Sequence, residues 1–518
     1  STPLLLENKL QYSIRPETHE FITKQVLTGH IWEKETVPER KDQYYIREVA
    51  RSIQAWFKEN TATDKGKFLE ILLSRVKLIV NVVDDKEEKI FSSLNGGKVN
   101  LDGADLLRAI LMTRAAKEKY HGTSATSEVR EFRIRMGMEL DLMNLWFGKT
   151  ADYFKQFISD QTIGMARINR FDFTTLPINL LYLLYYEYRR NEKESLNFSF
   201  FEYGKNSNGN PDDDRWEMYL ELQDAILQRW YNDKELYHYL GFLFFNFKAQ
   251  TPFRDIYTQW KALNSRDKFL KDIQHTIATR MLDRYLEETE KAAPDYQKCL
   301  KTMTEAISDF RENWYNNDKE LYQILILLDI FRILDSKSIK KLPTDYFTRK
   351  SGQKDGEDKE HILSQTPRKD NGEIATIKTD WERFAQSEDF KDIRSQMQEI
   401  LNHSDAELTE QELTQLQNLL NSAGLNSIGN MVLLDLRINR SYGNADYAHK
   451  RTIIFQEYMN QKYVRPHTLA VFMKGDIDAR EATGIPLNRW TLEDIKRNTD
   501  KIAKEIGKNF NAWLTQNN

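Results

Sequence analysis

The chain has 518 residues, of which 30% are charged and 12% aromatic, and its formal net charge is -4. These values exclude a disordered chain, and the length allows about three domains. The near-neutral charge excludes a global attraction to nucleic acid, so any DNA binding must come from a local group of basic residues. The single cysteine, Cys299, excludes an intramolecular disulfide and a cysteine-rich zinc site.

The sequence shows neither a membrane span nor a signal peptide. Its longest apolar runs, Leu240 to Phe247 and Ile324 to Leu328, are much shorter than the roughly 20 residues that cross a bilayer as a helix. No leader pattern follows Ser1, and a start at serine indicates a processed or truncated chain. We therefore expect a cytoplasmic protein that does not bind a membrane.

The N-terminal segment predicts one strand and two helices. Residues Lys9 to Arg15 alternate apolar and polar side chains, as a half-buried strand does. Pro16 suits the first turn of a helix, and apolar residues recur at helical spacing within residues 43–59.

A glycine turn lies further along the chain. Val76 to Val83 is rich in β-branched residues and predicts a buried strand. The later turn Asn95-Gly96-Gly97-Lys98 precedes an apolar helix. Backbone N–H groups in such a turn can bind a phosphate, which makes Asn95, Gly97 and Lys98 candidate nucleotide-binding residues. Turns of this composition also simply connect two elements, and the residues alone leave both interpretations open.

Residues 130–334 predict one helix after another. A short echo lies among them, in which Trp230 to Tyr237 recurs as Trp314 to Tyr322. In each copy an Asn or Asp side chain can cap the helix that follows. His238 lies on the first of these helices, where a hydrogen-bonded core histidine is favoured over a ligand. The basic, polar stretch Ser336 to Pro343 is the expected domain boundary.

The C-terminal region carries the strongest chemical signal. Glu360 and His361 lie together at the end of a strand-like segment, and Asn430 to Ile438 forms a second one. Neighbours on a strand point to opposite faces, so one of the pair can hold a metal while the other reaches a water if the chain bends there. Histidine can take a proton from water near neutral pH, and Glu360 with the amide oxygen of Asn439 suits Mg²⁺ or Mn²⁺.

Further elements surround these two segments. Residues 368–424 predict a helical insertion between them, and a basic helix covers Tyr447 to Met459. Thr491, with Asp494 at the third position, caps the last helix. Basic side chains near the second segment could contact DNA phosphates or could be ordinary surface charges. They are Arg437, Arg440, Lys450 and Arg451.

The C-terminal pattern resembles the HNH (ββα-metal) nuclease domain of GmrSD-type type IV restriction enzymes. Their hallmark reads E-H-I-L-P-Q, then N-x-x-G-N-L-x-L-L, then an asparagine and a helix with a lysine. The matching residues are Glu360, His361, Ile362, Leu363, Gln365, Asn426, Gly429, Asn430, Leu433, Leu434, Asn439 and Lys450. Ser364 replaces the proline and Met431 replaces a leucine. We expect Asn430 to fix the strand backbone near His361 through its side-chain amide.

The N-terminal segment resembles a second domain of the same family. Ile90 to Ala109 resembles the F-x-x-L-N-x-G-K segment and the helix after it in the ParB-like domain, which binds and hydrolyses a nucleotide in that family. The diagnostic D-G-Q-Q-R segment of that domain does not occur in this sequence. The resemblance therefore implies a nucleoside triphosphate as ligand, without assigning its hydrolysis to residues.

We expect a mainly α fold with small sheets (α+β) and three domains. A ParB-like nucleotide-binding domain covers residues 1–125, a helical middle domain residues 126–338, and an HNH-type nuclease domain residues 339–518. By resemblance, the protein is a metal-dependent endonuclease that cuts modified phage DNA in antiviral defence.

Two other functions stay open. One is a nucleotide-sensing regulator with a degenerate nuclease domain, which Ser364 and the absent upstream segment favour. The other is an RNA-directed nuclease, because HNH chemistry attacks a phosphodiester bond and does not itself exclude RNA. The residues identify neither a DNA modification nor whether the chain forms a homo-oligomer.

Overall fold

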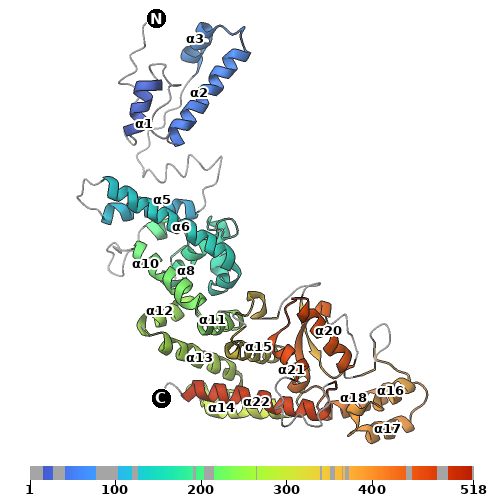
Figure 1. Ribbon diagram of the computed structural model, residues 1–518. Coiled ribbons are helices and arrows are strands. Elements are labelled where there is room, and N and C mark those ends of the chain that lie inside the picture. The colour runs from blue at the N-terminus through green and yellow to red at the C-terminus, as the bar shows by residue number, and fades with distance from the viewer. Residues whose placement is uncertain are drawn as a thin grey trace. The chain divides into compact units, whose positions relative to one another are not determined.

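The structure is a computed structural model that describes residues 16–26, 41–76, 103–119, 126–190, 194–202, 215–263, 265–338, 341–349, 356–364, 366–367, 373–438, 446–474 and 488–515. The chain divides into two compact units, residues 1–86 and 87–518 (Figure 1). Most described residues are helical, and the described strands form one antiparallel pair. The mainly α fold with a small sheet is thereby confirmed, whereas the division into three domains stays a prediction.

The described residues of the first unit form three α-helices and a short π-helix. They are α1 (Pro16–Phe21), which continues as the π-helix η1 (Ile22–Val26), α2 (Lys41–Glu59) and α3 (Lys65–Arg75). The two helices expected here are therefore present. The strand expected at residues 9–15 lies outside the described residues, as does all but Val76 of the strand expected at residues 76–83.

The second unit begins with a long series of helices. Its α-helices up to residue 335 are α5 (Gly103–Lys119), α6 (Thr126–Phe154), α7 (Asp160–Ile168), α8 (Asn179–Arg189), α9 (Phe198–Glu202), α10 (Arg215–Gln223), α11 (Lys234–Phe247), α12 (Phe253–Leu263), α13 (Arg266–Leu282), α14 (Tyr296–Ser308) and α15 (Asp318–Asp335). The π-helix η3 (Asp224–Tyr231) precedes α11, and the 3-10 turn η7 (Trp314–Asn316) precedes α15.

The echo predicted a cap in each copy, and the structure has one. Asp233 caps α11, because its carboxylate accepts 3.0 Å hydrogen bonds from the N–H groups of Glu235 and Leu236. Asn317 makes no side-chain cap on α15 and instead donates to the Glu320 carboxylate at 2.8 Å, so the second cap was predicted wrongly. His238 is a buried core histidine, as expected: its Nε2 accepts from the Leu342 N–H at 2.9 Å, and Nδ1 lies 2.5 Å from the Lys234 carbonyl oxygen.

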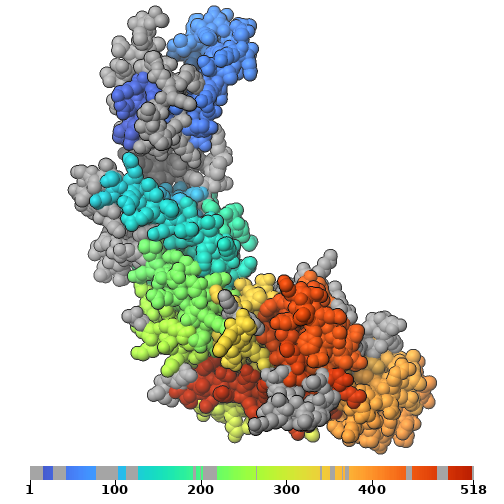
Figure 2. Space-filling model, viewed as in Figure 1, coloured from blue at the N-terminus to red at the C-terminus, as the bar shows by residue number. Residues whose placement is uncertain are grey.

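The C-terminal part of this unit holds the strand pair. β1 (Glu357–His361) pairs antiparallel with β2 (Met431–Asp435), and His361 lies opposite Met431. The expected helical insertion is present as α16 (Lys378–Ala385), α17 (Arg394–Asn402) and α18 (Glu410–Ser422). In Figure 2 it forms an orange lobe. The strands are followed by α20 (Tyr447–Met459), α21 (Pro466–Met473) and α22 (Leu492–Thr515), and the Thr491–Asp494 cap of α22 is confirmed.

Among the described residues of the second unit, buried side chains form two apolar cores, and α22 contributes to both. Ile506, Phe510 and Trp513 pack with the long helical series, whereas Ile495 packs with the strand pair and the insertion. Gly429, just before β2, lies against α22 so closely that a Cβ atom would come within 2.3 Å of the Ile495 carbonyl oxygen. The described helices include none that is long and apolar enough to cross a membrane.

Candidate active site

Asn430 fixes the chain where it leaves β1. Its side-chain Oδ1 accepts from the Leu363 N–H at 2.8 Å, and its Nδ2 donates to the carbonyl groups of Leu363 at 3.0 Å and Leu425 at 2.9 Å. Its backbone carbonyl also accepts from the Ile362 N–H at 2.9 Å. Asn430 is fully buried, so these bonds are shielded from water. These bonds fix the backbone just before Ser364. In the family motif a proline stands at the position of Ser364, and its ring would restrict the same part of the backbone.

The imidazole of His361 is held on two sides. Its Nε2 lies 3.0 Å from Oδ1 of Asn426, whose Nδ2 donates in turn to Asn421 at 2.6 Å. The ring of Tyr315 stacks on the imidazole with 4.8 Å between the centroids and 20° between the planes. With the Asn426 oxygen as acceptor, the ring proton lies on Nε2 and Nδ1 is the basic nitrogen. The sequence motif includes Asn426 without giving it a role, and the repeat of Trp230 to Tyr237 as Trp314 to Tyr322 contains Tyr315 without connecting it to His361.

Glu360 and Lys450 meet beside His361. Lys450 Nζ donates to the His361 carbonyl at 2.7 Å and lies 3.4 Å from the Glu360 carboxylate. The Lys450 side chain is 0% exposed, and burial lowers the pKa of its amine while Glu360 opposes that shift. Both interpretations of Lys450, as a DNA contact and as an ordinary surface charge, assumed a surface position. That position was wrong, because the first turn of α20 points this side chain into the protein, whereas its contact with DNA stays an untested prediction.

The other candidate phosphate contacts differ in exposure. The Arg437 side chain is 60% exposed and lies 3.3 Å from the Asp435 carboxylate, at the end of β2. Arg451 is half-buried and donates from Nε to the Phe472 carbonyl at 2.9 Å, which ties α20 to α21. Arg440 lies outside the described residues, as do Asn95, Gly97 and Lys98 of the candidate nucleotide-binding turn. Arg437 is thus the most exposed of the described candidates, and its charge is paired with that of Asp435.

The described residues fit a divalent cation held by few protein atoms. They contain no cluster of three or more His, Cys, Asp or Glu side chains that could hold a metal. Glu360 offers one carboxylate, 19% exposed, and Asn439 lies outside the described residues. Mg²⁺ commonly keeps several waters and takes one or two carboxylates together with substrate phosphate oxygens, so this donor set is compatible with it.

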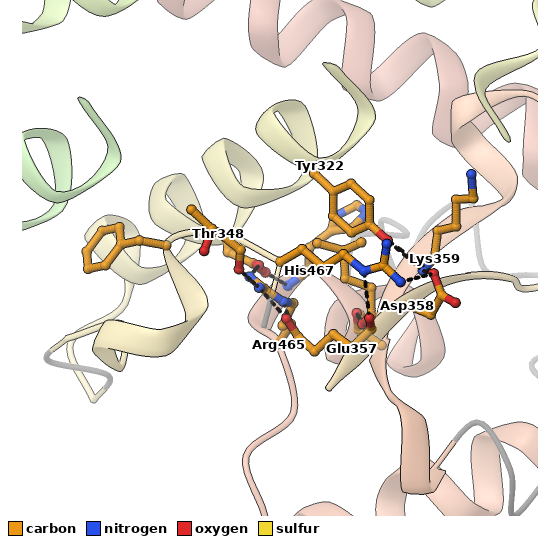
Figure 3. A network of polar contacts seen from close by, with 12 residues as sticks. Tyr322, Thr348, Glu357, Asp358, Lys359, Arg465 and His467 are labelled. Carbon is orange, nitrogen blue, oxygen red and sulfur yellow. Dashed lines mark hydrogen bonds and ion pairs between the residues drawn. The ribbon is translucent and has the colours of Figure 1, made fainter. Parts of the chain in front are cut away.

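A buried ionic network anchors the start of β1. Arg465, which precedes α21, donates to Glu357 of β1 and to Asp329 of α15 with distances of 2.7 to 2.8 Å (Figure 3). The same Asp329 accepts from the His467 N–H at 2.7 Å. Burial raises the pKa of Asp329, and the Arg465 charge opposes this rise. The network joins α15, β1 and α21, and no sequence pattern predicts it.

Residues 304–505 match the family profile described as GmrSD restriction endonucleases, C-terminal domain. No curated protein and no solved structure matches the chain. The match covers about two fifths of the sequence and includes both strands, the two residues that hold His361, and all three members of the ionic network. It does not reach the N-terminal segment that resembles a ParB-like domain.

Proposed function

We propose, on the basis of the match of residues 304–505 to the GmrSD restriction endonuclease C-terminal domain, that the protein is a metal-dependent, HNH-type endonuclease that cleaves phosphodiester bonds of foreign, modified DNA. The observation that carries the proposal is the fixed imidazole of His361 at the end of β1, next to a carboxylate in the adjoining position. A general base must be held in place to act on a water, and this one is held from two sides.

His361 takes the proton from the attacking water through Nδ1. While the proton is held, Nε2–H keeps its hydrogen bond to Asn426, so the ring does not have to turn. The stacked ring of Tyr315 presents its electron-rich face to the imidazolium, which favours the charged form as the proton arrives. The chain thereby supplies both the orientation and part of the charge stabilisation of its base.

Glu360 is the residue that would hold the cation, with Asn439 as the second protein ligand. When bound there, a divalent cation would stabilise the negative charge that develops on the phosphate. Lys450 keeps the Glu360 carboxylate and the His361 carbonyl in place from the inner side of the strand. Regulation by a nucleoside triphosphate belongs to the same proposal through the N-terminal resemblance.

The test is cleavage of unmodified DNA, phage-derived DNA and RNA in parallel, each with Mg²⁺, with Mn²⁺ and without metal. His361→Ala should lower the cleavage rate by about 10² to 10⁴. His449→Ala is the matched control, because that histidine is exposed on α20. DNA cutting by the His361 variant at the wild-type rate would reject this site.

The same assay separates the alternatives. A chain that cuts only RNA would be an RNA-directed nuclease. A chain that cuts nothing but binds nucleotide would be the regulatory protein with a degenerate nuclease domain.

A further inference from the structure

The two copies of the short sequence repeat, Trp230 to Tyr237 and Trp314 to Tyr322, make the same kind of contact with a lysine. In the first copy, Lys341 Nζ donates to the Tyr231 carbonyl at 2.5 Å and lies 3.6 Å from the centroid of the Tyr231 ring. In the second copy, Lys359 Nζ donates to the Tyr315 carbonyl and lies 4.1 Å from the centroid of that ring. Each copy thus presents a tyrosine whose carbonyl and ring together hold one lysine ammonium.

The two copies differ in what else the tyrosine ring contacts. Tyr231 packs edge-on against Trp146, Tyr153 and Tyr237 in the helical core. Tyr315 stacks almost parallel on the imidazole of His361. Only the second copy therefore joins the lysine clamp to the candidate active site.

Lys359 holds β1 and Tyr315 together. It lies on β1 two residues before His361, and its ammonium also pairs with Asp318 at the start of α15. The same strand segment is thus tied to η7 twice, once through Lys359 and once through the stacked rings. Rotation of the Tyr315 ring away from His361 would also break its contact with the Lys359 ammonium, which lies 4.1 Å from the ring centroid.

We propose that Tyr315 is a positioning residue for the catalytic imidazole, which rests on the proposed function of His361. The stack fixes the plane of the ring, and the hydrogen bond from Nε2 to Asn426 fixes its rotation within that plane. The positioning depends on the face of the Tyr315 ring and not on its hydroxyl group. For its hydroxyl, the described part of the chain provides no hydrogen-bond partner.

The experiment compares Tyr315→Leu, Tyr315→Phe and Tyr231→Leu in the full chain, with metal-dependent DNA cleavage and unfolding as readouts. Tyr315→Leu should lower kcat by about 10 to 10² with little change in KM, because a misplaced reacting group loses rate rather than binding. Tyr315→Phe keeps the ring and should stay within about threefold of wild type. Tyr231→Leu removes the equivalent ring of the other copy, so it should lower the melting temperature and spare kcat.

Wild-type kcat in Tyr315→Leu would overturn the inference, and so would an equal loss of kcat in Tyr231→Leu. A loss in Tyr315→Phe as large as that in Tyr315→Leu would also overturn it, because the hydroxyl would then matter. These outcomes apply when His361→Ala cuts DNA much more slowly than wild type. Equal cutting by those two proteins would reject the proposed function itself.

Discussion

Arg465 and Glu357 form a two-point ion pair with N–O distances of 2.8 and 2.7 Å, and each side chain is only 2% exposed. Glu357 opens the strand that His361 ends, and the third partner, Asp329, lies on α15. The first residue of β1 is therefore fixed by a charge network that connects the strand to the helical series, and this helps to place His361 at the other end of the strand. At that end, Asn430 fixes the chain.

The first prediction concerns Arg465→Met, which removes the positive member of this network. Two buried carboxylates then lose their common partner, and breaking a buried pair in this way costs about 3 to 5 kcal/mol. We expect a matching loss in the free energy of unfolding measured with urea at neutral pH. Arg437→Met is the control, because a 60% exposed side chain should change stability by less than about 0.5 kcal/mol. Equal midpoints for the two variants would contradict the prediction.

The second prediction concerns Gly429, where the strand pair meets α22. An added Cβ would lie 2.3 Å from both the Ile495 carbonyl oxygen and Thr499 Oγ1, and 2.7 Å from the Thr499 nitrogen. Two of these atoms are backbone, so Gly429→Ala should cost about 1 to 3 kcal/mol through forced shifts. Gly164→Ala is the matched control, because nothing lies within 4 Å of a Cβ there. In helix α7 that change should be neutral or stabilising by up to about 1 kcal/mol, and urea unfolding compares the two.

The third prediction concerns stability below neutral pH. Burial lowers the pKa of His238 to about 4 from its usual value near 6.5. Between these values the unfolded chain binds a proton that the folded chain does not, so stability rises with pH. The His238 contribution is therefore complete above about pH 6.5 and is lost progressively as pH falls toward 4, by about 3 kcal/mol in total.

The measurement is the free energy of unfolding from pH 7.5 to 4.5 for wild type, His238→Gln and His403→Gln. His238→Gln should flatten the slope in this window, although it lowers stability at pH 7.5. His403 is exposed, so its variant should follow wild type. A slope unchanged in His238→Gln would show that other groups carry the pH dependence.

The sequence predicts the elements of the site better than their contacts. The sequence located the helix Tyr447 to Met459 at the observed bounds of α20, and the family motif implied that Asn430 lies near His361, which the antiparallel pairing of β1 and β2 brings about. The burial of Lys450 depends on which face of α20 packs against β1, and the lysine itself carries no sign of it. Arg465 lies 108 positions from Glu357 and 136 from Asp329, and no local pattern connects positions so far apart.

The last prediction separates positioning from DNA contact at Lys450. A lysine that neutralises a phosphate releases a counterion, so its loss should reduce the slope of log affinity against log salt by about one. Lys450 is buried and donates to the His361 carbonyl, so Lys450→Met should leave this slope and the DNA affinity unchanged. It should lower the cleavage rate by about 10 to 10², because β1 loses a contact at the catalytic residue.

Arg437→Ala should show the opposite pattern, with weaker, less salt-dependent binding and a cleavage rate near wild type at saturating DNA. DNA binding measured by fluorescence anisotropy across a salt series checks both variants, and a reduced slope in Lys450→Met would return that lysine to the DNA interface.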